Sequence, residues 1–265
     1  MKKSILLLSC IIALNACTVS KPKATKIKFA DNPVVAHRGA WKTQNLPENS
    51  IASLKEAIRL GCTGSEFDVR MTLDDSLIIN HDPHYNKLDI EKTTYAELTK
   101  TPLSNGEKLP TLREYILAGK ENNTTTRLVC EIKPSASKER GKLIADKVLK
   151  LVKDLQAEAI TVYISFDYDI LKRIEEVKPD ASTQHLNGDK SPDQILADKI
   201  DGIDYHFSVF KKNPDWAAAA LKNKLILNAW TVNDEAEMKN LLNQKFEFIT
   251  TNEPELLFKI LKESK

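Results

Sequence analysis

Short apolar runs and longer amphipathic stretches alternate along the chain from about Pro33 onward. The short runs are rich in β-branched and aromatic residues, which predicts β-strands. Eight strands are predicted, at Val34–Gly39, Ser65–Thr72, Arg127–Lys133, Ile160–Ser165, Ser182–Leu186, Gly202–Phe207, Leu225–Val232 and Phe246–Thr251. A helical stretch follows each strand, and this order predicts a series of parallel crossover units.

The longer stretches carry apolar residues at helical spacing and predict amphipathic helices. They are Ser50–Leu60, Thr111–Lys120, Lys138–Leu155, Tyr168–Val177, Pro192–Asp198, Asp215–Asn223, Asp234–Gln244 and Pro254–Glu263. Ser50 is expected to cap the first of them. The longest is expected to turn its lysines to water and to pack one face on the core. That face carries Leu143, Val148, Leu151, Val152 and Leu155.

The number and order of these elements predict the fold class. Eight strand–helix units within about 220 residues indicate one α/β domain, a single (β/α)8 or TIM barrel. An open, doubly wound sheet is the competing architecture. No G-x-G-x-x-G motif or phosphate loop follows the first strand, and no internal repeat changes the prediction.

The start of the chain has the order of a secretory signal, in which an apolar run from Ile5 to Leu14 follows two lysines. The run is too short to span a bilayer. The segment Leu14-Asn15-Ala16-Cys17 at its end resembles the bacterial lipobox. That resemblance implies cleavage before Cys17 and lipidation of its thiol. The alternative is an ordinary signal peptide that happens to contain a cysteine.

These features divide the chain into three parts. Residues 1–16 are predicted to be a lipoprotein signal peptide, residues 17–31 a lysine-rich flexible tether, and residues 32–265 the barrel domain. Several acyl chains on one cysteine would hold the mature protein at a membrane. The expected location is therefore the bacterial cell envelope, with the protein lipid-anchored in the periplasm or at the outer membrane.

Composition and charge exclude several classes of protein. Of 265 residues, 42% are apolar and 29% are charged, so the chain can bury a core and is neither disordered nor fibrous. The 39 basic and 37 acidic residues give a net charge of +2. Loss of Lys2 and Lys3 with the signal leaves 39 − 2 = 37 basic residues and no net charge. A neutral chain is not expected to bind nucleic acid.

Candidate chemistry lies at the ends of the first two strands. His37 and Arg38 end the first strand, and a barrel keeps its active site at the carboxyl ends of its strands. In the second strand, side chains alternate, so Glu66 and Asp68 share the face that looks into the barrel, together with Arg70. Like charges in a low-dielectric interior need a cation between them.

The third strand adds Glu131 and Lys133 on one face. Together with Glu66 and Asp68, Glu131 completes a set of three hard oxygen donors, which predicts a site for Mg²⁺ or Ca²⁺ with open positions for water and substrate. The alternative is a set of structural ion pairs, either between Glu66 and Arg70 or between Glu131 and Lys133.

A second histidine, His81, ends a short apolar run beyond the second strand. It is either a surface histidine or, with His37, one of two proton-transfer groups for displacement at a metal-bound phosphate. The remaining histidines, His84, His185 and His206, lack comparable neighbours in the sequence.

Two of the four cysteines remain in the predicted domain, since Cys10 would leave with the signal and Cys17 would carry the lipid. If Glu66 and Glu131 reach one ion, Cys62 and Cys130 are offset by three residues, or roughly 10 Å at the usual strand rise. A disulfide tolerates a Cα separation of only about 7 Å. Both thiols are therefore predicted to be free.

The sequence resembles the glycerophosphodiester phosphodiesterase family from Val34 to Leu257. The matching landmarks, in order, are HRG at 37–39, PEN at 47–49, EFD at 66–68, HD at 81–82, EIK at 131–133, SF at 165–166 and WTVN at 230–233. The segments 105–112 and 250–254 are similar to further family loops, the latter with Asn252 where an Asp is common.

The resemblance implies a (β/α)8 barrel and roles for particular residues. Glu66, Asp68 and Glu131 would bind one divalent cation, Mg²⁺ or Ca²⁺, and His37 and His81 would be the catalytic acid–base pair. The resemblance implies phosphate- or substrate-binding roles for four further residues, namely Arg38, Lys133, Glu48 and Trp230. Asn49 would instead serve the turn into the first helix, and a buried core position is the alternative for Trp230.

The implied activity is metal-dependent hydrolysis of glycerophosphodiesters, such as deacylated phospholipids, to glycerol 3-phosphate and an alcohol. One histidine would activate the attacking oxygen and the other would protonate the leaving alkoxide. A phospholipase D-like enzyme or a cyclising lyase acting on lipid phosphodiesters is the enzymatic alternative. A catalytically silent lipoprotein that binds glycerophospho compounds is the alternative from another class.

Overall fold

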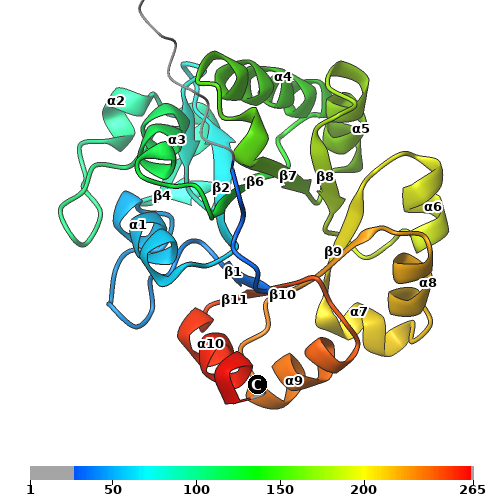
Figure 1. The fold of residues 1–265 in the computed structure, drawn as a ribbon. Helices are drawn as coiled ribbons and strands as arrows, with labels where there is room; N and C mark the ends of the chain where they lie inside the picture. Colours follow the sequence, from blue (N-terminus) through cyan, green and yellow to red (C-terminus); the bar gives the residue numbers. More distant parts are fainter. Residues whose placement is uncertain (1–26, 264–265) are drawn as a thin grey trace, which may run out of the picture.

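In a computed structural model, which describes residues 27–263, eight parallel strands form a closed barrel inside a ring of helices (Figure 1). Strand β1 pairs with both β11 and β2, and this double pairing closes the sheet. The single (β/α)8 barrel is therefore confirmed and the open sheet is excluded. The barrel strands are β1 (Val34–Ala36), β2 (Gly64–Met71), β6 (Arg127–Ile132), β7 (Thr161–Ser165), β8 (Ser182–His185), β9 (Gly202–His206), β10 (Ile226–Trp230) and β11 (Phe248–Thr251).

All eight predicted helices are present, with ends that shift by one residue at most. They are α1 (Ile51–Leu60), α3 (Leu112–Lys120), α4 (Lys138–Asp154), α5 (Tyr168–Val177), α6 (Pro192–Ala197), α8 (Trp216–Lys222), α9 (Glu235–Asn243) and α10 (Pro254–Glu263). Ser50 caps α1 as predicted, because its side chain accepts a hydrogen bond from the backbone N–H of Ser53. Helix α7 (Phe207–Lys212) and the 3₁₀ helix η2 (Glu158–Ile160) were not predicted.

Between β2 and α3 the chain makes an excursion that the sequence did not predict. Strand β3 (Leu77–Ile79) returns antiparallel to β2. The elements β4 (His84–Tyr85), β5 (Leu88–Asp89), η1 (Ile90–Lys92) and α2 (Tyr95–Leu98) follow. They close over a small apolar cluster of Ile78, Ile90, Leu98 and Leu109. This excursion holds the loop that carries His81 beside the barrel mouth.

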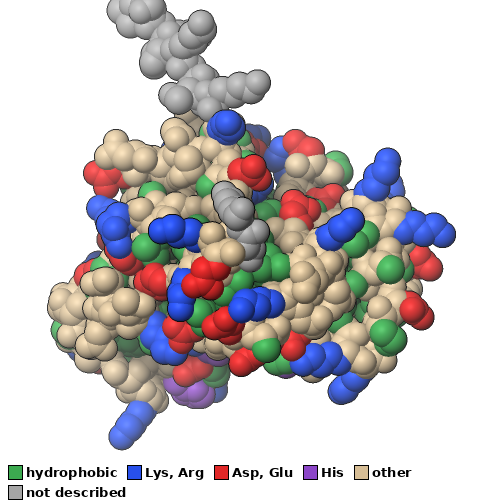
Figure 2. Space-filling view, turned by 60° about the horizontal axis from the view of Figure 1, so that its bottom comes forward, with side chains coloured by type: hydrophobic (Ala, Val, Ile, Leu, Met, Phe, Trp, Pro, Cys, Tyr) green, Lys and Arg blue, Asp and Glu red, His purple; other side chains and the backbone are tan. Residues whose placement is uncertain are grey.

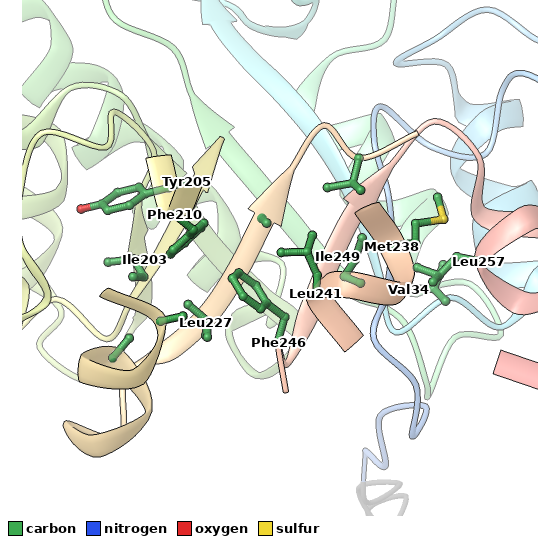
Figure 3. Close-up of a cluster of buried hydrophobic side chains, with 14 of the residues drawn as sticks. Val34, Ile203, Tyr205, Phe210, Leu227, Met238, Leu241, Phe246, Ile249 and Leu257 are labelled. Atoms are coloured by element: carbon green, nitrogen blue, oxygen red, sulfur yellow. The ribbon is translucent and has the colours of Figure 1, made fainter. Parts of the chain in front are cut away.

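The main core lies between the strands and the helices. Figure 3 shows Val34 and Ile249 beside Met238 and Leu241 of α9, and Leu227 farther along the same cluster of buried side chains. The side chains that face the barrel axis form a second, inner core. At the amino end of the barrel this inner core is apolar, with Val35, Val129, Val162 and Phe248. Polar side chains replace them toward the carboxyl ends of the strands.

The buried face of α4 agrees with the predicted one at Val148, Leu151, Val152 and Leu155, and differs from it at Leu143. Leu143 is 43% exposed, whereas Ile144, Val148 and Val152 are buried. Residues 141, 144, 148 and 152 form a stripe with steps of three and four residues, and Leu143 lies off it. Gly141 begins this stripe, where a Cβ atom would lie 3.3 Å from Ile170 of α5. Close packing against α5 therefore sets the rotation of α4.

The predicted tether is wrong at its last residues. The backbone N–H groups of Lys28 and Ala30 donate to the carbonyls of Thr124 and Thr125, at 3.1 and 2.8 Å. The guanidinium of Arg127 lies 3.9 Å from the centre of the Phe29 ring. Residues 27–31 therefore belong to the packed domain, at the amino end of the barrel. The predicted signal peptide and Cys17 lie outside the described residues.

The outer surface carries both signs of charge, and basic and acidic side chains are interspersed on the face drawn in Figure 2. Among the described residues, none of the helices has the length and apolar character needed to cross a membrane. Cys62 and Cys130 are buried and free, as predicted. Cys130 is the register partner of Phe67 on β2, and Cys62 lies 67 − 62 = 5 residues before Phe67. The predicted offset of three residues was therefore too small.

Candidate active site

A tight turn after β1 brings His37 and Arg38 to the barrel mouth. Arg38 has a φ of 56° and Gly39 a φ of 80°, so two consecutive residues are left-handed. A Cβ atom at Gly39 would lie 2.4 Å from Oγ of Ser53, which leaves room only for glycine. The Ser53 hydroxyl in turn donates to the carbonyl of Arg38 at 3.0 Å. Packing on α1 therefore fixes the turn.

The three predicted carboxylates meet beside this turn. Glu66 and Asp68 extend from β2 and Glu131 from β6, where Asp68 and Glu131 are partners in register. One carboxylate oxygen of each lies within 4.8 Å of the others, and all three side chains are buried. The Oε1 atom of Glu66 has no hydrogen-bond partner among the described residues. Hard oxygen donors at this spacing fit a divalent cation such as Mg²⁺ or Ca²⁺.

The electrostatics of the three carboxylates also fit a cation. Burial, and then the charges of Asp68 and Glu131, raise the pKa of Glu66 well above its ordinary value. Burial and the charge of Asp68 raise the pKa of Glu131 to about 8. Burial opposes ionisation of Asp68 too, but the charges of Lys133 and His81 bring its pKa to about 2. A bound cation would relieve the repulsion that keeps protons on this cluster.

Two basic side chains reach the carboxylates. Nζ of Lys133 lies 2.7 Å from Oε1 of Glu131 and 3.2 Å from Oδ1 of Asp68. Nε of Arg38 lies 3.7 Å from Oδ2 of Asp68. The ion pair between Glu131 and Lys133 is thus present within the cluster. The alternative pair of Glu66 with Arg70 is not, since the Arg70 guanidinium donates to the carbonyl of His81 at 2.7 and 2.9 Å.

Glu48 contacts Arg38 rather than the carboxylate cluster. Nη1 of Arg38 donates to both carboxylate oxygens of Glu48, at 2.8 and 2.9 Å. The Glu48 side chain is 43% exposed, whereas that of Arg38 is 18% exposed. Glu48 therefore orients the guanidinium from the solvent side of the mouth.

Asn49 has a role at the site that the sequence analysis missed. Its Nδ2 donates to Oδ2 of Asp68 at 2.8 Å, and its Oδ1 accepts from the backbone N–H of Asp68 at 3.2 Å. Asn49 has a φ of 59°, a conformation that asparagine tolerates better than most residues. Its position in the PEN landmark was the one indication of a role at the site. The expected turn explained that position, so the contact with β2 was not predicted.

His37 is held in one orientation by Asn252. Its Nδ1 lies 2.7 Å from Oδ1 of Asn252, and an amide oxygen only accepts, so Nδ1 carries the proton. Nε2 then faces the carboxylates, 4.0 Å from Oε2 of Glu66. Burial, and then the charge of Arg38, lower the pKa of His37 to about 4. The imidazole is therefore neutral near pH 7, with Nε2 available to accept a proton.

His81 faces the same pocket from the loop after β3. Its Nδ1 lies 2.7 Å from Oδ1 of Asp82, and its side chain is 34% exposed. The two predicted histidines thus meet at one pocket. His84 is exposed, and His185 pairs with Asp189 at 2.7 Å, away from the pocket.

The pocket between these groups has a volume of about 180 Å³. His37, His81 and the charged cluster line one side of it. The other side is formed mainly by apolar side chains, those of Ile164, Phe166, Leu186 and Trp230. Trp230 is half-buried, its ring packs edge-on against Phe166 at 5.3 Å, and its Nε1 donates to the carbonyl of Asp204. Trp230 therefore lines the pocket and also packs against the inner apolar cluster.

One acidic residue of this pocket, Asp204, was also missed. It lies on β9, its side chain is buried, and it lines the apolar side of the pocket. Burial, and then the charge of Glu131, raise its pKa well above the ordinary value. Alternation with Ile203 and Tyr205 in the strand predicts that it faces the barrel axis. A single acidic residue between apolar ones does not by itself indicate a functional site.

Comparison with known proteins gives a consistent result. Residues 37–256 match the Glycerophosphoryl diester phosphodiesterase family. A glycerophosphodiester phosphodiesterase of Caldanaerobacter subterraneus subsp. tengcongensis is 28% identical over 244 residues, which cover 86% of this chain and 97% of that protein.

Solved structures agree on the fold. A crystal structure of a glycerophosphodiester phosphodiesterase from Parabacteroides distasonis is 37% identical and superposes with a TM-score of 0.86, covering 89% of this chain and 99% of that one. The structure of an Oleispira antarctica phosphodiesterase in complex with the product sn-glycerol-3-phosphate is 24% identical, with a TM-score of 0.74 over 87% of this chain and 97% of that one.

Proposed function

Because this chain belongs to the glycerophosphoryl diester phosphodiesterase family, a family of phosphoric diester hydrolases, we propose that it hydrolyses glycerophosphodiesters to glycerol 3-phosphate and an alcohol. The observation that carries the proposal is the meeting of three kinds of group at one pocket of about 180 Å³. These are a buried carboxylate cluster, two basic side chains and two histidines.

The basic side chains suit a phosphodiester, which is a monoanion. Its charge moves toward the non-bridging and leaving oxygens as the new bond forms. Arg38, oriented by Glu48, and Lys133, oriented by Glu131, would hold the non-bridging oxygens and stabilise that charge.

A divalent cation fits the site as a cofactor. Glu66, Asp68 and Glu131 would hold it, and Asn49 fixes Asp68 for that task through two hydrogen bonds. When bound, the cation supplies Lewis-acid stabilisation of the phosphoryl oxygens. We propose Mg²⁺ or Ca²⁺, since oxygen donors suit both ions.

The two histidines would move the protons. His37 is neutral near pH 7 and presents Nε2 to the pocket, which is the form that a general base requires. His81 lies on the same pocket, and Asp82, 2.7 Å from its Nδ1, orients the ring. One group accepts the proton of the attacking oxygen and the other donates a proton to the leaving alkoxide.

The pocket size favours a small polar substrate. The Oleispira antarctica phosphodiesterase binds sn-glycerol-3-phosphate as a product, and the same compound would be a product here. A volume of about 180 Å³ lies below the usual range for pockets of drug-sized ligands, which favours a small group such as glycerophosphate.

A substrate panel tests the proposal. Glycerophosphocholine, glycerophosphoethanolamine and lysophosphatidylcholine are each incubated with Mg²⁺, with Ca²⁺ and with a chelator. We expect release of glycerol 3-phosphate from the first two, and loss of about 10³-fold or more of the rate on chelation, because a metal supplies several kcal/mol of transition-state stabilisation. Full activity with chelator would refute the metal, and activity on the lysolipid alone would refute the substrate class.

We further propose that the mature chain is attached to the bacterial cell envelope by lipid on Cys17. The support is the lipobox-like segment 14–17 after an apolar run of signal length. Labelling of cells with a fatty-acid analogue should mark the wild-type protein and not the Cys17→Ser variant. Equal labelling of both would exclude this anchor.

A further inference from the structure

The carboxyl group of Asp204 is not used by the proposed chemistry, although it lines the same pocket. Its side chain is 1% exposed, and Oδ1 has no hydrogen-bond partner among the described residues. Burial of an unpaired polar atom costs free energy, and for a carboxyl group this cost is larger than for a neutral one. Asp204 therefore does not behave as a stabilising core residue.

The neighbours of Asp204 in the barrel are already engaged. Asn228 is its partner in register on β10, and the Asn228 amide exchanges two hydrogen bonds with Oγ1 of Thr250, at 3.1 and 3.3 Å. Glu131, whose charge acts on Asp204, contacts Lys133. The Asn228 amide is thus already engaged by Thr250, and no hydrogen bond from Asn228 or Glu131 reaches the Oδ1 atom of Asp204.

The surroundings of Asp204 have the character of a subsite for a polyol. Ile164, Leu186 and Trp230 line the pocket with it, so a carbon chain finds apolar contacts there and a hydroxyl can reach the Asp204 carboxyl group. The Trp230 ring is held beside Asp204, because its Nε1 donates a hydrogen bond to the backbone carbonyl of Asp204 at 2.9 Å. The phosphate-binding groups Arg38 and Lys133 occupy the opposite side of the pocket.

We infer that Asp204 is a substrate-binding residue that accepts a hydrogen bond from a hydroxyl of the glycerol moiety. This inference rests on the proposed function and adds a specificity determinant to it. A site that hydrogen-bonds a substrate hydroxyl rejects an analogue that lacks it, because the buried polar group is then left unpaired. Asp204 would thereby distinguish glycerol esters from simple alkyl esters of the same phosphate.

The test compares two substrates that differ only in these hydroxyls, glycerophosphocholine and propylphosphocholine. Asp204→Leu should lower kcat/KM for glycerophosphocholine by about 10- to 100-fold, because a desolvated substrate hydroxyl is then left without its hydrogen-bond partner. The same variant should change kcat/KM for propylphosphocholine by less than about threefold. Asp204→Asn retains an acceptor oxygen and should restore most of the activity on glycerophosphocholine.

Gln184→Met is the matched control. Gln184 is buried on the neighbouring strand β8, and its Oε1 also has no hydrogen-bond partner among the described residues, but it does not line the pocket. Its removal should leave both substrates unaffected. Equal loss on both substrates in Asp204→Leu, a changed cation requirement in that variant, or no loss at all would overturn the inference.

Calorimetry separates this inference from the proposed function. Wild-type protein should bind sn-glycerol 3-phosphate about 10- to 100-fold more tightly than Asp204→Leu does, with inorganic phosphate bound equally by both. Equal affinity of both proteins for glycerol 3-phosphate would overturn the role of Asp204. Absence of glycerophosphodiester hydrolysis by the wild-type protein would instead refute the proposed function.

Discussion

On the β1–β2–β6 side of the barrel mouth, charged side chains contact one another. On the β7–β10 side the pocket is mainly apolar, and the Oδ1 atom of Asp204 has no hydrogen-bond partner within residues 27–263. Arg38, Asp68 and Lys133 belong to one connected network on the first side. Residues of one network act as a unit, and their substitution effects are large and not additive. The apolar side contacts substrate through separate groups, whose effects are expected to be smaller and to appear in KM.

The largest effect is expected from the histidines on the charged side. His37→Ala and His81→Ala should each lower kcat by about 10²–10⁴-fold, the usual contribution of a positioned acid or base. His84→Ala is the control, because His84 is exposed and outside the pocket. Circular dichroism would verify folding. Unchanged kcat in the His81 variant would exclude its catalytic role.

Arg38→Lys tests whether geometry matters within the network beyond charge. Lysine keeps the positive charge but cannot hold Glu48 and a phosphate oxygen in one plane. We expect kcat/KM to fall by about 10- to 100-fold, since hydrogen bonds to charged groups are lost. Glu48→Gln, which removes only the orienting charge, should have a smaller effect. A full rate in Arg38→Lys would show that charge alone suffices.

Trp230→Leu tests the apolar side. The indole would lose its contacts with Phe166 and substrate, but the network across the pocket would stay intact. KM should rise by about three- to tenfold, a loss of the size of one aromatic contact, and kcat should change little. Steady-state kinetics on glycerophosphocholine would measure both. A fall in kcat equal to that of the histidine variants would contradict the expected difference between the charged and the apolar side of the pocket.

The smallest expected effect is on stability without a cation. The pKa of Glu131 is about 8 in the folded protein, against 4.5 ordinarily, so the folded state retains a proton that the unfolded state releases. The contribution of Glu131 to the free energy of unfolding is therefore fully present below about pH 4.5. It is lost as the pH rises from there through about 8. With chelator, the Tm should fall by about 2–4 °C for each kcal/mol lost.

A divalent cation should reverse this loss of stability, because it binds the ionised carboxylates. Differential scanning calorimetry at pH 6 and pH 8, with and without Mg²⁺, would measure the change. The cation should raise the Tm more at pH 8 than at pH 6. An equal increase at both pH values would mean that the cation does not act through the protonated cluster.

The barrel could be predicted because its signals are periodic. The strands are short apolar runs and the helices have apolar stripes, and the two kinds of segment follow one another eight times along the chain. The excursion between β2 and α3 contains strands of only two or three residues, such as β4 (His84–Tyr85), in which no period can be seen. It is held by its own small core, which depends on contacts distant in sequence.

Site residues could be predicted where several charged residues share one strand. They were missed where a single polar residue contributes from its own loop or strand. Glu66 and Asp68 alternate on one strand, so their common face follows from the period of two. Asn49, Asn252 and Asp204 reach the pocket or its carboxylates from separate loops and strands. Only the closed barrel brings them together, and no local pattern marks a residue whose partner lies on another element.

The N-terminal segment also bears on the direction in which the pocket opens. Lys28 and Ala30 are bound beside the amino ends of β2 and β6, while His37 and the carboxylates lie at the other end of the barrel. With the proposed anchor at Cys17, the chain would attach to the membrane from the closed end. The mouth would then lie on the side of the domain opposite the attached end, open to water-soluble diesters.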